Sequence, residues 1–141
     1  MKILIDTCVL LDFLFQRGEG GLQARDVFVW ASQHGHSLYL ASKQMEDLYY
    51  IVHQHSHDKA ATAEAMKSLL SFIEVLDTTG PDTVIALADQ GPDYEDNILI
   101  EVAERQGMNV LLSQDHKGFL ASPIPAYTPT AFLKKFASSA H

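Results

Sequence analysis

Two carboxylates stand where short apolar segments of the chain end. The segment 3–5 runs directly into Asp6, and the segment 109–112 is followed within three residues by Asp115. Short continuous apolar runs are typical of buried parallel strands. Open parallel sheets bind ligands at the carboxyl ends of the strands, where the strand order reverses. If the two segments form neighbouring strands at that point, Asp6 and Asp115 line one crevice.

Two further carboxylates fall on expected helices. Asp96 shares a helix face with Ile100 and Ala103, which is the face that packs on the sheet, so its side chain points inward near the strand ends. Burying an unpaired carboxylate is costly, and Asp96 therefore needs a cation. Asp47 begins another helix, and the adjacent Glu46 points about 100° away around the helix axis.

These four carboxylates predict an oxygen-rich site for a hard divalent cation, Mg²⁺ or Mn²⁺, because no Lys or Arg in the same motifs compensates them. Such an ion orients a phosphodiester, lowers the pKa of an attacking water and stabilises the charge on the leaving oxygen. The structural alternative is helix capping, by Asp6 or Thr7 before the helix 8–15 and by Asp93 before the helix 94–106.

Strands that alternate with helices predict a parallel sheet with helices on both sides. Beyond the strand that runs into Asp6, strands are expected at 37–41, 73–76, 109–112 and 125–127. Helices are expected at 8–15, 22–34, 43–53 with Ser42 as its N-cap, 60–72, 82–89, 94–106 and 130–137. The glycine-rich stretch 16–21 is expected to be a loop.

The composition indicates one globular domain, 1–141, with a net charge of −8. That charge disfavours non-specific nucleic-acid binding through a basic surface and favours a basic partner. No apolar run is long enough for a transmembrane helix, and no room precedes the first strand for a signal peptide, so we expect a cytoplasmic protein without a membrane partner. The lone Cys8 is interpreted as a small core residue.

Five stretches carry a family resemblance that covers nearly the whole chain. They are LIDTCVLLDFL at 4–14, ASKQMEDLYYIV at 41–52, DYEDNILIEVAERQG at 93–107, LLSQDHKGF at 111–119 and YTPTAFLKKF at 127–136. The chain resembles PIN-domain proteins, of the kind found as VapC-like toxins of bacterial and archaeal toxin–antitoxin pairs. The resemblance implies a three-layer α/β/α sandwich with a central, mostly parallel sheet of four to five strands.

The resemblance also implies a metal-dependent ribonuclease acting on RNA. Its four acids fall on Asp6, Asp47, Asp96 and Asp115, with Glu46 as the fallback for the second. Asp6, Asp96 and Asp115 would hold Mg²⁺ or Mn²⁺, and Asp47 would complete the site or accept a proton. Nearby, Thr7, Ser113 and Asp93 are expected to support these ligands. The implied partner is a basic antitoxin that places an Arg or Lys in the site, and a homodimer is a further candidate assembly.

Two residues depart from the family pattern. Cys8 stands where an Asn usually follows the first Asp-Thr, and Gly118 stands where many members have an acid before the Phe of the fourth motif. Neither departure removes one of the four main acids. The alternative function from another class is a non-catalytic PIN-like module that binds RNA or a protein.

Overall fold

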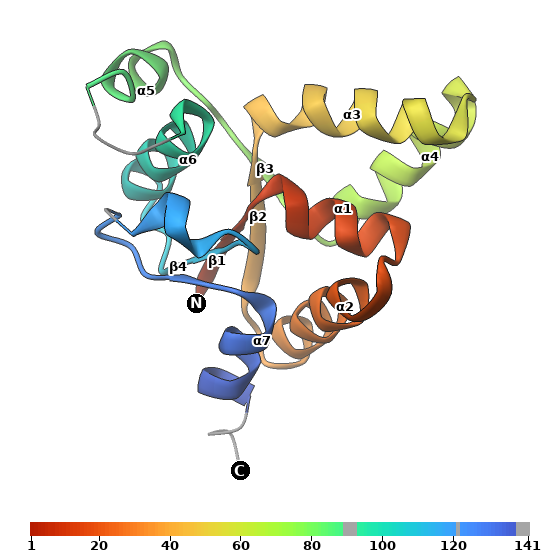
Figure 1. Ribbon diagram of the computed structural model, residues 1–141, viewed down its shortest axis with the longest axis horizontal. Coiled ribbons are helices and arrows are strands. Elements are labelled where there is room, and N and C mark those ends of the chain that lie inside the picture. Colours follow the sequence, from red (N-terminus) through yellow and green to blue (C-terminus); the bar gives the residue numbers. More distant parts are fainter. Residues whose placement is uncertain (89–92, 121, 138–141) are drawn as a thin grey trace.

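A five-stranded sheet forms the centre of the molecule in the computed structural model, which describes residues 1–88, 93–120 and 122–137 (Figure 1). Every pair of neighbouring strands is parallel, and the strand order is β3-β2-β1-β4-β5. The strands are β1 (Lys2–Ile5), β2 (Ser37–Ala41), β3 (Glu74–Leu76), β4 (Val110–Leu112) and β5 (Ala126–Tyr127). The expected parallel α/β architecture is confirmed.

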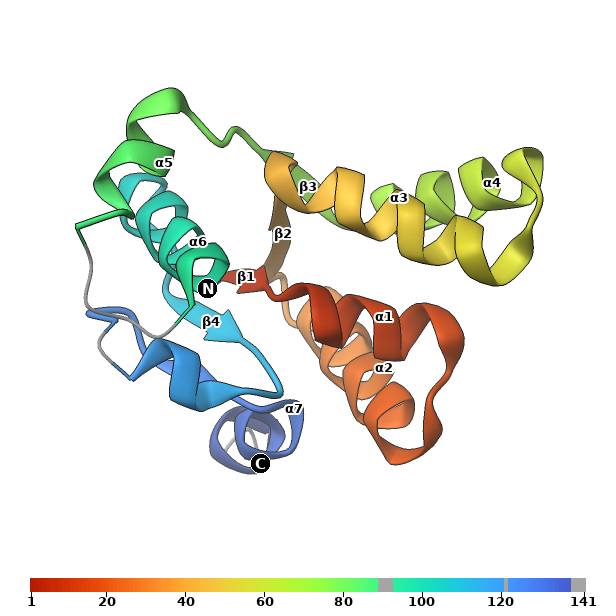
Figure 2. The ribbon, with the colours of Figure 1, turned by 45° about the horizontal axis from the view of Figure 1, so that its top comes forward.

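Helices cover both faces of this sheet, as Figure 2 shows for the two groups on either side of β1 and β4. In the described residues they are α1 (Thr7–Phe15), α2 (Gly18–Gln33), α3 (Ser42–Ser56), α4 (Lys59–Leu70), α5 (Gly80–Ile85), α6 (Tyr94–Arg105) and α7 (Pro129–Phe132). A 3-10 turn spans His116–Phe119, and a π turn at Leu133–Ala137 continues α7. None of these helices is long and apolar enough to cross a membrane.

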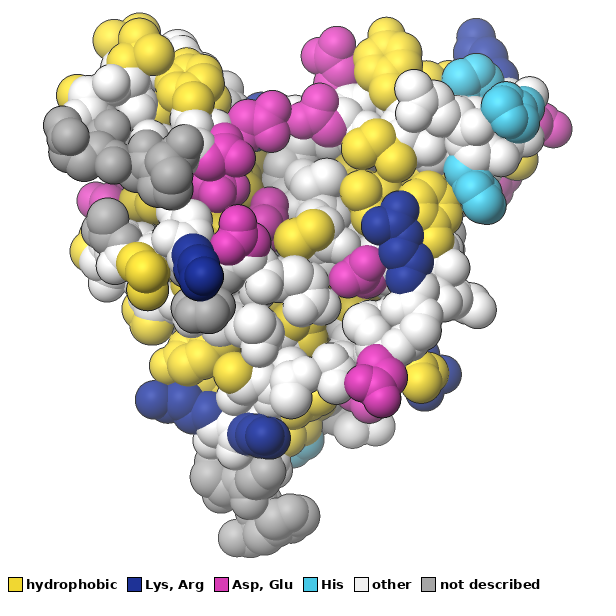
Figure 3. Space-filling view, in the orientation of Figure 1, with side chains coloured by type: hydrophobic (Ala, Val, Ile, Leu, Met, Phe, Trp, Pro, Cys, Tyr) yellow, Lys and Arg dark blue, Asp and Glu magenta, His cyan; other side chains and the backbone are white. Residues whose placement is uncertain are grey.

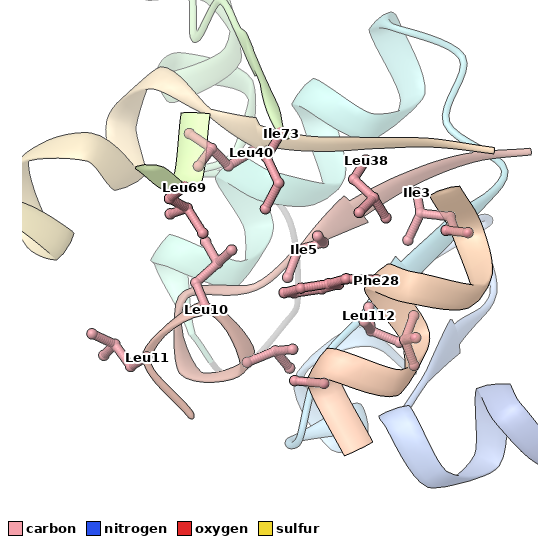
Figure 4. Packing of buried hydrophobic residues seen from close by; sticks show 14 of the residues in the cluster. Ile3, Ile5, Leu10, Leu11, Phe28, Leu38, Leu40, Leu69, Ile73 and Leu112 are labelled. Atoms are coloured by element: carbon pink, nitrogen blue, oxygen red, sulfur yellow. The ribbon is translucent and has the colours of Figure 1, made fainter. Parts of the chain in front are cut away.

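Alternation along the strands creates two cores. Ile3 and Ile5 pack on one face with side chains from α1, α2, α3, α4 and α7, among which Phe28 and Leu69 are visible in Figure 4. Leu4 points to the other face, where it meets the apolar side of α6. Ile3, Leu4 and Ile5 are fully buried, and each burial stabilises the fold by about 1.5–3 kcal/mol.

The strand order reverses between β1 and β4. The chain leaves β1 through α1 and α2 to reach β2, and it returns through α5 and α6 to β4 on the other side of β1. Ile5 lies beside Leu112 in the paired strands, and the Asp6 amide donates to the Leu112 carbonyl at 2.8 Å. The expected neighbourhood of the two strands is therefore confirmed, and both open onto one edge of the sheet.

The expected loop at 16–21 is wrong from Gly18 onward, because α2 already begins there. Gly20 and Gly21 serve close packing between α1 and α2, whereas Gly18 supplies a positive φ of 52° where α2 begins. A Cβ on Gly21 would lie 2.8 Å from the backbone of both Asp12 and Gln16. A run of glycines can therefore permit a close helix–helix approach as well as a turn.

The expected N-cap at Ser42 is also wrong, since Ser42 is the first residue of α3. Its hydroxyl accepts from the Thr78 amide at 2.9 Å and so ties the start of α3 to the segment after β3. The Gln44 side chain instead accepts from the Ala41 amide at 2.7 Å. The remaining element ends differ from expectation by a few residues; the end of the expected helix 82–89 lies outside the described residues.

Candidate active site

Asp6 occupies the N-cap of α1, immediately after β1. One carboxylate oxygen, Oδ1, accepts from the Thr7 amide at 2.8 Å. The other, Oδ2, accepts from the Ser113 hydroxyl at 2.7 Å and from the Cys8 thiol at 3.4 Å. The capping interpretation of Asp6 is therefore correct in geometry, yet it leaves a lone pair on Oδ1 for a further ligand.

Ser113 connects the ends of the two central strands. Its side chain is fully buried and donates to Asp6 while accepting from the Asp115 amide at 3.1 Å. Thr7 supports Asp6 through its backbone amide and not through its hydroxyl. The Thr7 hydroxyl accepts from Gln44 Nε2 at 3.1 Å, and the same amide group donates to the Ile5 carbonyl at 2.9 Å. Thr7 thus holds Asp6 through its backbone and anchors α3 through its side chain.

A cavity of about 270 Å³ lies against Asp6, between α3 and α6. Asp6 and Thr7 form its base, α3 contributes Asp47, and α6 contributes Asp96 and Leu99. Figure 3 shows acidic side chains gathered around a hollow on this face, between α6 and the start of α3. Three of the four expected acids therefore line one cavity.

The remaining expected residues surround this cavity. Asp115 is exposed at the start of the 3-10 turn and lies outside the cavity lining, though its charge reaches Asp96. Asp93 caps α6 by accepting from the Glu95 amide at 2.8 Å. Glu46 is exposed and outside the lining, so the register of α3 places Asp47 in the site.

Asp96 is the most perturbed carboxyl of the site. Its pKa rises from the ordinary 3.8 to about 7, chiefly because the group is half-buried and then because Asp6, Asp93 and Asp115 are nearby. Lys43 opposes the rise. Perturbed titration in a cleft is typical of functional sites. At neutral pH Asp96 is therefore only partly ionised, because its negative charge lacks an adequate counter-ion.

The donor set fits a divalent cation in its chemistry. Hard cations prefer carboxylate oxygens, and a cation beside Asp96 would relieve the repulsion that raises its pKa. Within the described residues, however, no three Asp, Glu, His or Cys side chains are arranged to hold one ion together. A shared ion would therefore require the carboxylates to turn toward one another, and the expected cluster of Asp6, Asp96 and Asp115 stays a prediction.

Besides the apolar Ile51 and Leu99, three polar lining residues were not recognised from the sequence as part of the site. Lys43 and Tyr50 lie on α3, and Glu95 lies at the start of α6. From the sequence alone, Lys43 looks like an ordinary surface lysine and Glu95 like a surface acid. The expectation that no Lys or Arg compensates the acids is wrong at Lys43, which lines the cavity and lowers the pKa of Asp96. The spacing of Lys43, Asp47 and Tyr50 at three and four residues could have revealed a shared helix face. Outside the cavity, Asp12 would be predicted from the sequence to be a surface acid, but it is mostly buried and accepts from Gln114 Nε2 at 3.3 Å.

The sequence from residue 2 to residue 117 matches the family model described as PIN domain. The chain belongs to the PIN-domain family. No curated protein matches the chain.

Solved structures of similar fold include components of toxin–antitoxin complexes, and they cover nearly the whole PIN fold. One is DNA-bound VapBC from Salmonella typhimurium, at 19% identity and a TM-score of 0.70, covering 92% of this chain and 98% of that one. Another is VapBC2 from Rickettsia felis bound to a promoter DNA fragment. Its identity is 13% and its TM-score 0.69, and the match covers 91% of this chain and 98% of that one. A third is VapC20 from Mycobacterium tuberculosis, described as a toxin that cleaves the sarcin-ricin loop. Its identity is 17% and its TM-score 0.64, and the match covers 86% of this chain and 95% of that one. At these identities the likeness shows the fold.

The first departure from the PIN pattern, Cys8, keeps contact with the first acid. Its thiol donates to Asp6 Oδ2, and its sulfur lies 4.0 Å from the Ser113 hydroxyl. Burial, and then the neighbouring Asp6, raise the pKa of the thiol to about 11. Cys8 is therefore a neutral donor at physiological pH and is unsuited to be a nucleophile.

The second departure, Gly118, makes room for the third acid. A Cβ built on Gly118 would lie 2.1 Å from Asp96 Oδ2, a separation that real Cβ atoms do not adopt. The carboxylate of Asp96 thus fills the space in which a side chain at position 118 would begin. A side chain introduced here would require the Asp96 carboxylate to turn away from position 118.

Proposed function

We propose that this PIN-domain protein is a Mg²⁺- or Mn²⁺-dependent endoribonuclease and the toxin of a toxin–antitoxin pair. The observation that carries the proposal is Asp96, whose pKa reaches about 7 in a cavity that it shares with Asp6 and Asp47. This cavity lies beside the carboxyl ends of β1 and β4, where parallel sheets bind ligands. The protein would act in the cytoplasm, where its RNA substrate is found.

Each acid has a distinct role in this proposal. Asp6, Asp96 and Asp115 would hold the ion or ions, and hydrogen bonds from Thr7 and Ser113 keep Asp6 in place. A bound divalent ion would orient the phosphodiester and lower the pKa of the attacking water. Asp47, across the cavity, would complete the ligand set or accept the proton of that water. The fold of VapC20, whose description names an RNA-cleaving toxin, supports the choice of RNA.

The test is RNA cleavage with and without the first acid. Asp6→Asn keeps the shape of the side chain and its acceptor for Thr7, but it removes the charge. We expect cleavage to fall by roughly 100-fold or more, because even partners of metal ligands cost 10–100-fold when changed. EDTA should abolish cleavage by the unaltered chain. Glu64→Gln is the matched control, since Glu64 is exposed on α4 and outside the cavity lining.

Two outcomes would contradict the proposed ribonuclease activity. Cleavage that persists in both Asp6→Asn and EDTA would indicate a contaminating nuclease or metal-free chemistry. Binding of Mn²⁺ by calorimetry without any RNA cleavage would favour the non-catalytic PIN-like module.

The proposed antitoxin needs a surface of its own, and a groove of about 1160 Å³ beside α1 and α2 is suited to it. Phe13, Phe28 and Phe72 pack against one another along it, with ring centroids 4.9–5.9 Å apart. Leu22 and Val29 add exposed apolar side chains. An apolar face of a partner segment could bury this strip, and the net charge of −8 favours a basic partner.

The sequence suggests an exposed apolar strip beside the first helices, made of Leu11, Leu14, Phe15 and Trp30. Three of these four residues do not line the groove. Leu11 is buried in the core at 7% exposure. Trp30 is half-buried, packs edge-on against Phe132 and does not line the groove. Replacing Trp30 would therefore weaken the fold before it weakened partner binding. Leu14 does line the groove, whereas Phe15 instead contacts the ring of His55.

A further inference from the structure

One face of α3 continues from the acids to an aromatic ring. Lys43, Asp47, Tyr50 and Ile51 all line the cavity, and their spacing places them along one side of the helix. Tyr50 stands three residues beyond Asp47, which is about 4.5 Å along the helix axis. The cavity thus joins an acidic wall to an apolar and aromatic one.

The charge of the site creates a problem for a polyanionic substrate. Among the described lining residues, Lys43 is the one cation beside four acids, Asp6, Asp47, Glu95 and Asp96. The whole chain carries −8. Proteins usually obtain most of their non-specific RNA affinity from Lys and Arg contacts to phosphates. Apart from the proposed metal ion, the cavity therefore offers a phosphate little positive charge, and a contact that does not depend on charge would add affinity.

Tyr50 is placed to supply such a contact. Its side chain is 58% exposed, although it borders the cavity. The neighbouring Tyr49 ring lies at 86° to it with centroids 5.7 Å apart, so the two rings do not stack. Exposed aromatic rings bind unpaired bases by stacking, which works for any base because each has a π face.

We propose that Tyr50 is a base-binding platform that selects single-stranded RNA by stacking one unpaired nucleobase next to the phosphate held at the acids. This inference rests on the proposed ribonuclease function and names the residue that binds the base beside the phosphate. The cavity, at about 270 Å³, is far smaller than an RNA helix. In a duplex the base faces are covered by their neighbours, so paired RNA cannot use the ring.

The experiment measures RNA binding to the Asp6→Asn chain, which keeps RNA intact, in Mg²⁺ buffer. The probe is a short single-stranded RNA that carries 2-aminopurine, whose fluorescence falls when the base stacks on an aromatic ring. Adding Tyr50→Leu should weaken binding by roughly 5- to 150-fold and abolish the quenching. Tyr50→Phe keeps the ring and should retain most of both signals.

Tyr49→Leu is the matched control on the same helix, because Tyr49 stacks on His53 and lies outside the cavity lining. It should leave affinity and quenching unchanged. The same RNA in a duplex should bind no better to the Asp6→Asn chain than to its Tyr50→Leu derivative. The slope of log Kobs against log salt concentration should be near −0.7, roughly one phosphate contact.

The outcomes separate this inference from the proposed activity. Equal affinity of Tyr50→Leu and Tyr50 chains, or an Asp6→Asn chain that binds no RNA, overturns the base platform, even if the unaltered chain cleaves RNA. Ring-dependent binding without cleavage by the unaltered chain overturns the ribonuclease and leaves the platform standing. A steep salt dependence would show that phosphates, and not a stacked base, provide the affinity.

Discussion

At the scale of single residues, Asp96 links the electrostatics of the site to stability. Its folded pKa of about 7 lies above the ordinary 3.8, so between these values the folded chain binds more protons than the unfolded one. The contribution of Asp96 to stability is therefore fully present below about pH 4, falls as pH rises through this window, and is lost above about pH 7. Without metal, the ionised Asp96 costs stability at neutral and alkaline pH.

Asp96→Asn should consequently stabilise the metal-free protein at pH 8, by about 2 kcal/mol once solvent screening of a half-buried group is allowed for. The advantage should disappear near pH 4, where Asp96 itself is protonated. Urea unfolding in EDTA at both pH values measures the difference. Saturating Mn²⁺ should reverse the order at pH 8, since an ion at 100 times its Kd adds about 2.7 kcal/mol to the chain that binds it. A pH-independent difference would contradict the assignment.

The residues recognised from the sequence are those with a strong local signal. Asp6 follows an apolar strand, and Asp96 shares the packed face of a periodic helix, so both positions could be inferred. The sequence alone does not place Tyr50, Lys43 and Glu95 in the cavity. Their place in the cavity depends on how α3 and α6 lie relative to each other, which is set by packing on opposite faces of the sheet.

At the scale of elements, a buried ion pair fixes α5 to the far end of α6. Arg105 donates to the Asp82 carboxylate from Nε and Nη2 at 2.8–3.2 Å, and Nη2 also reaches the Asp77 carbonyl. Asp82 is 3% exposed. Hydrogen bonds from Arg105 are the main cause that lowers its pKa. Because α6 carries Asp96, this pair also steadies the helix that forms one wall of the site.

Arg105→Met should lower the free energy of unfolding at pH 7 by about 3 kcal/mol, the low end for breaking a buried pair, because Arg105 itself is 35% exposed. The loss should shrink as pH falls below about 4 and through the lowered pKa of Asp82. Protonation of Asp82 then removes its ionic interaction with Arg105. Arg25→Met is the matched control. Its pair with Asp26 spans 3.8 Å with both side chains more than half exposed, and it should change stability by less than about 0.5 kcal/mol. Equal effects in urea unfolding would refute the structural role of the Arg105 pair.

Element order and sheet type were predictable, whereas two local features were not. The alternation of strands and helices predicts the parallel sheet. The helical start of α2 is not visible in the sequence, because glycines that permit α1 and α2 to approach look like glycines of a loop. The role of Ser42 is hidden for a similar reason. Its partner Thr78 lies 36 residues away, and a local capping rule cannot include it.

At the scale of the whole molecule, acidity and the apolar groove should act on different steps of partner binding. Charge mainly sets the association rate, and buried apolar contacts set the residence time. Raising the salt concentration should slow association of a basic antitoxin more than it speeds dissociation. Val29→Asp, in the groove, should shorten the residence time by roughly tenfold or more.

Val84→Asp is the matched control for that experiment. Val84 is 66% exposed on α5, outside the lining of the groove. Surface plasmon resonance with a basic antitoxin protein as the partner provides both rates. Equal residence times for Val29→Asp and Val84→Asp would remove the groove as the docking surface. Binding that leaves RNA cleavage unaffected would remove the partner as an antitoxin.

The two cores described above have a consequence for how long the site persists. Asp6 and Asp47 sit on helices packed on one face of the sheet, while Asp96 sits on the helix packed on the other. The acids therefore meet only while both layers are docked. If either layer of helices separates briefly from the sheet, the acids move apart although the chain does not unfold. The lifetime of the assembled site is therefore set by the layer that opens more often. A partner that clamps the looser layer would lengthen that lifetime without touching an acid.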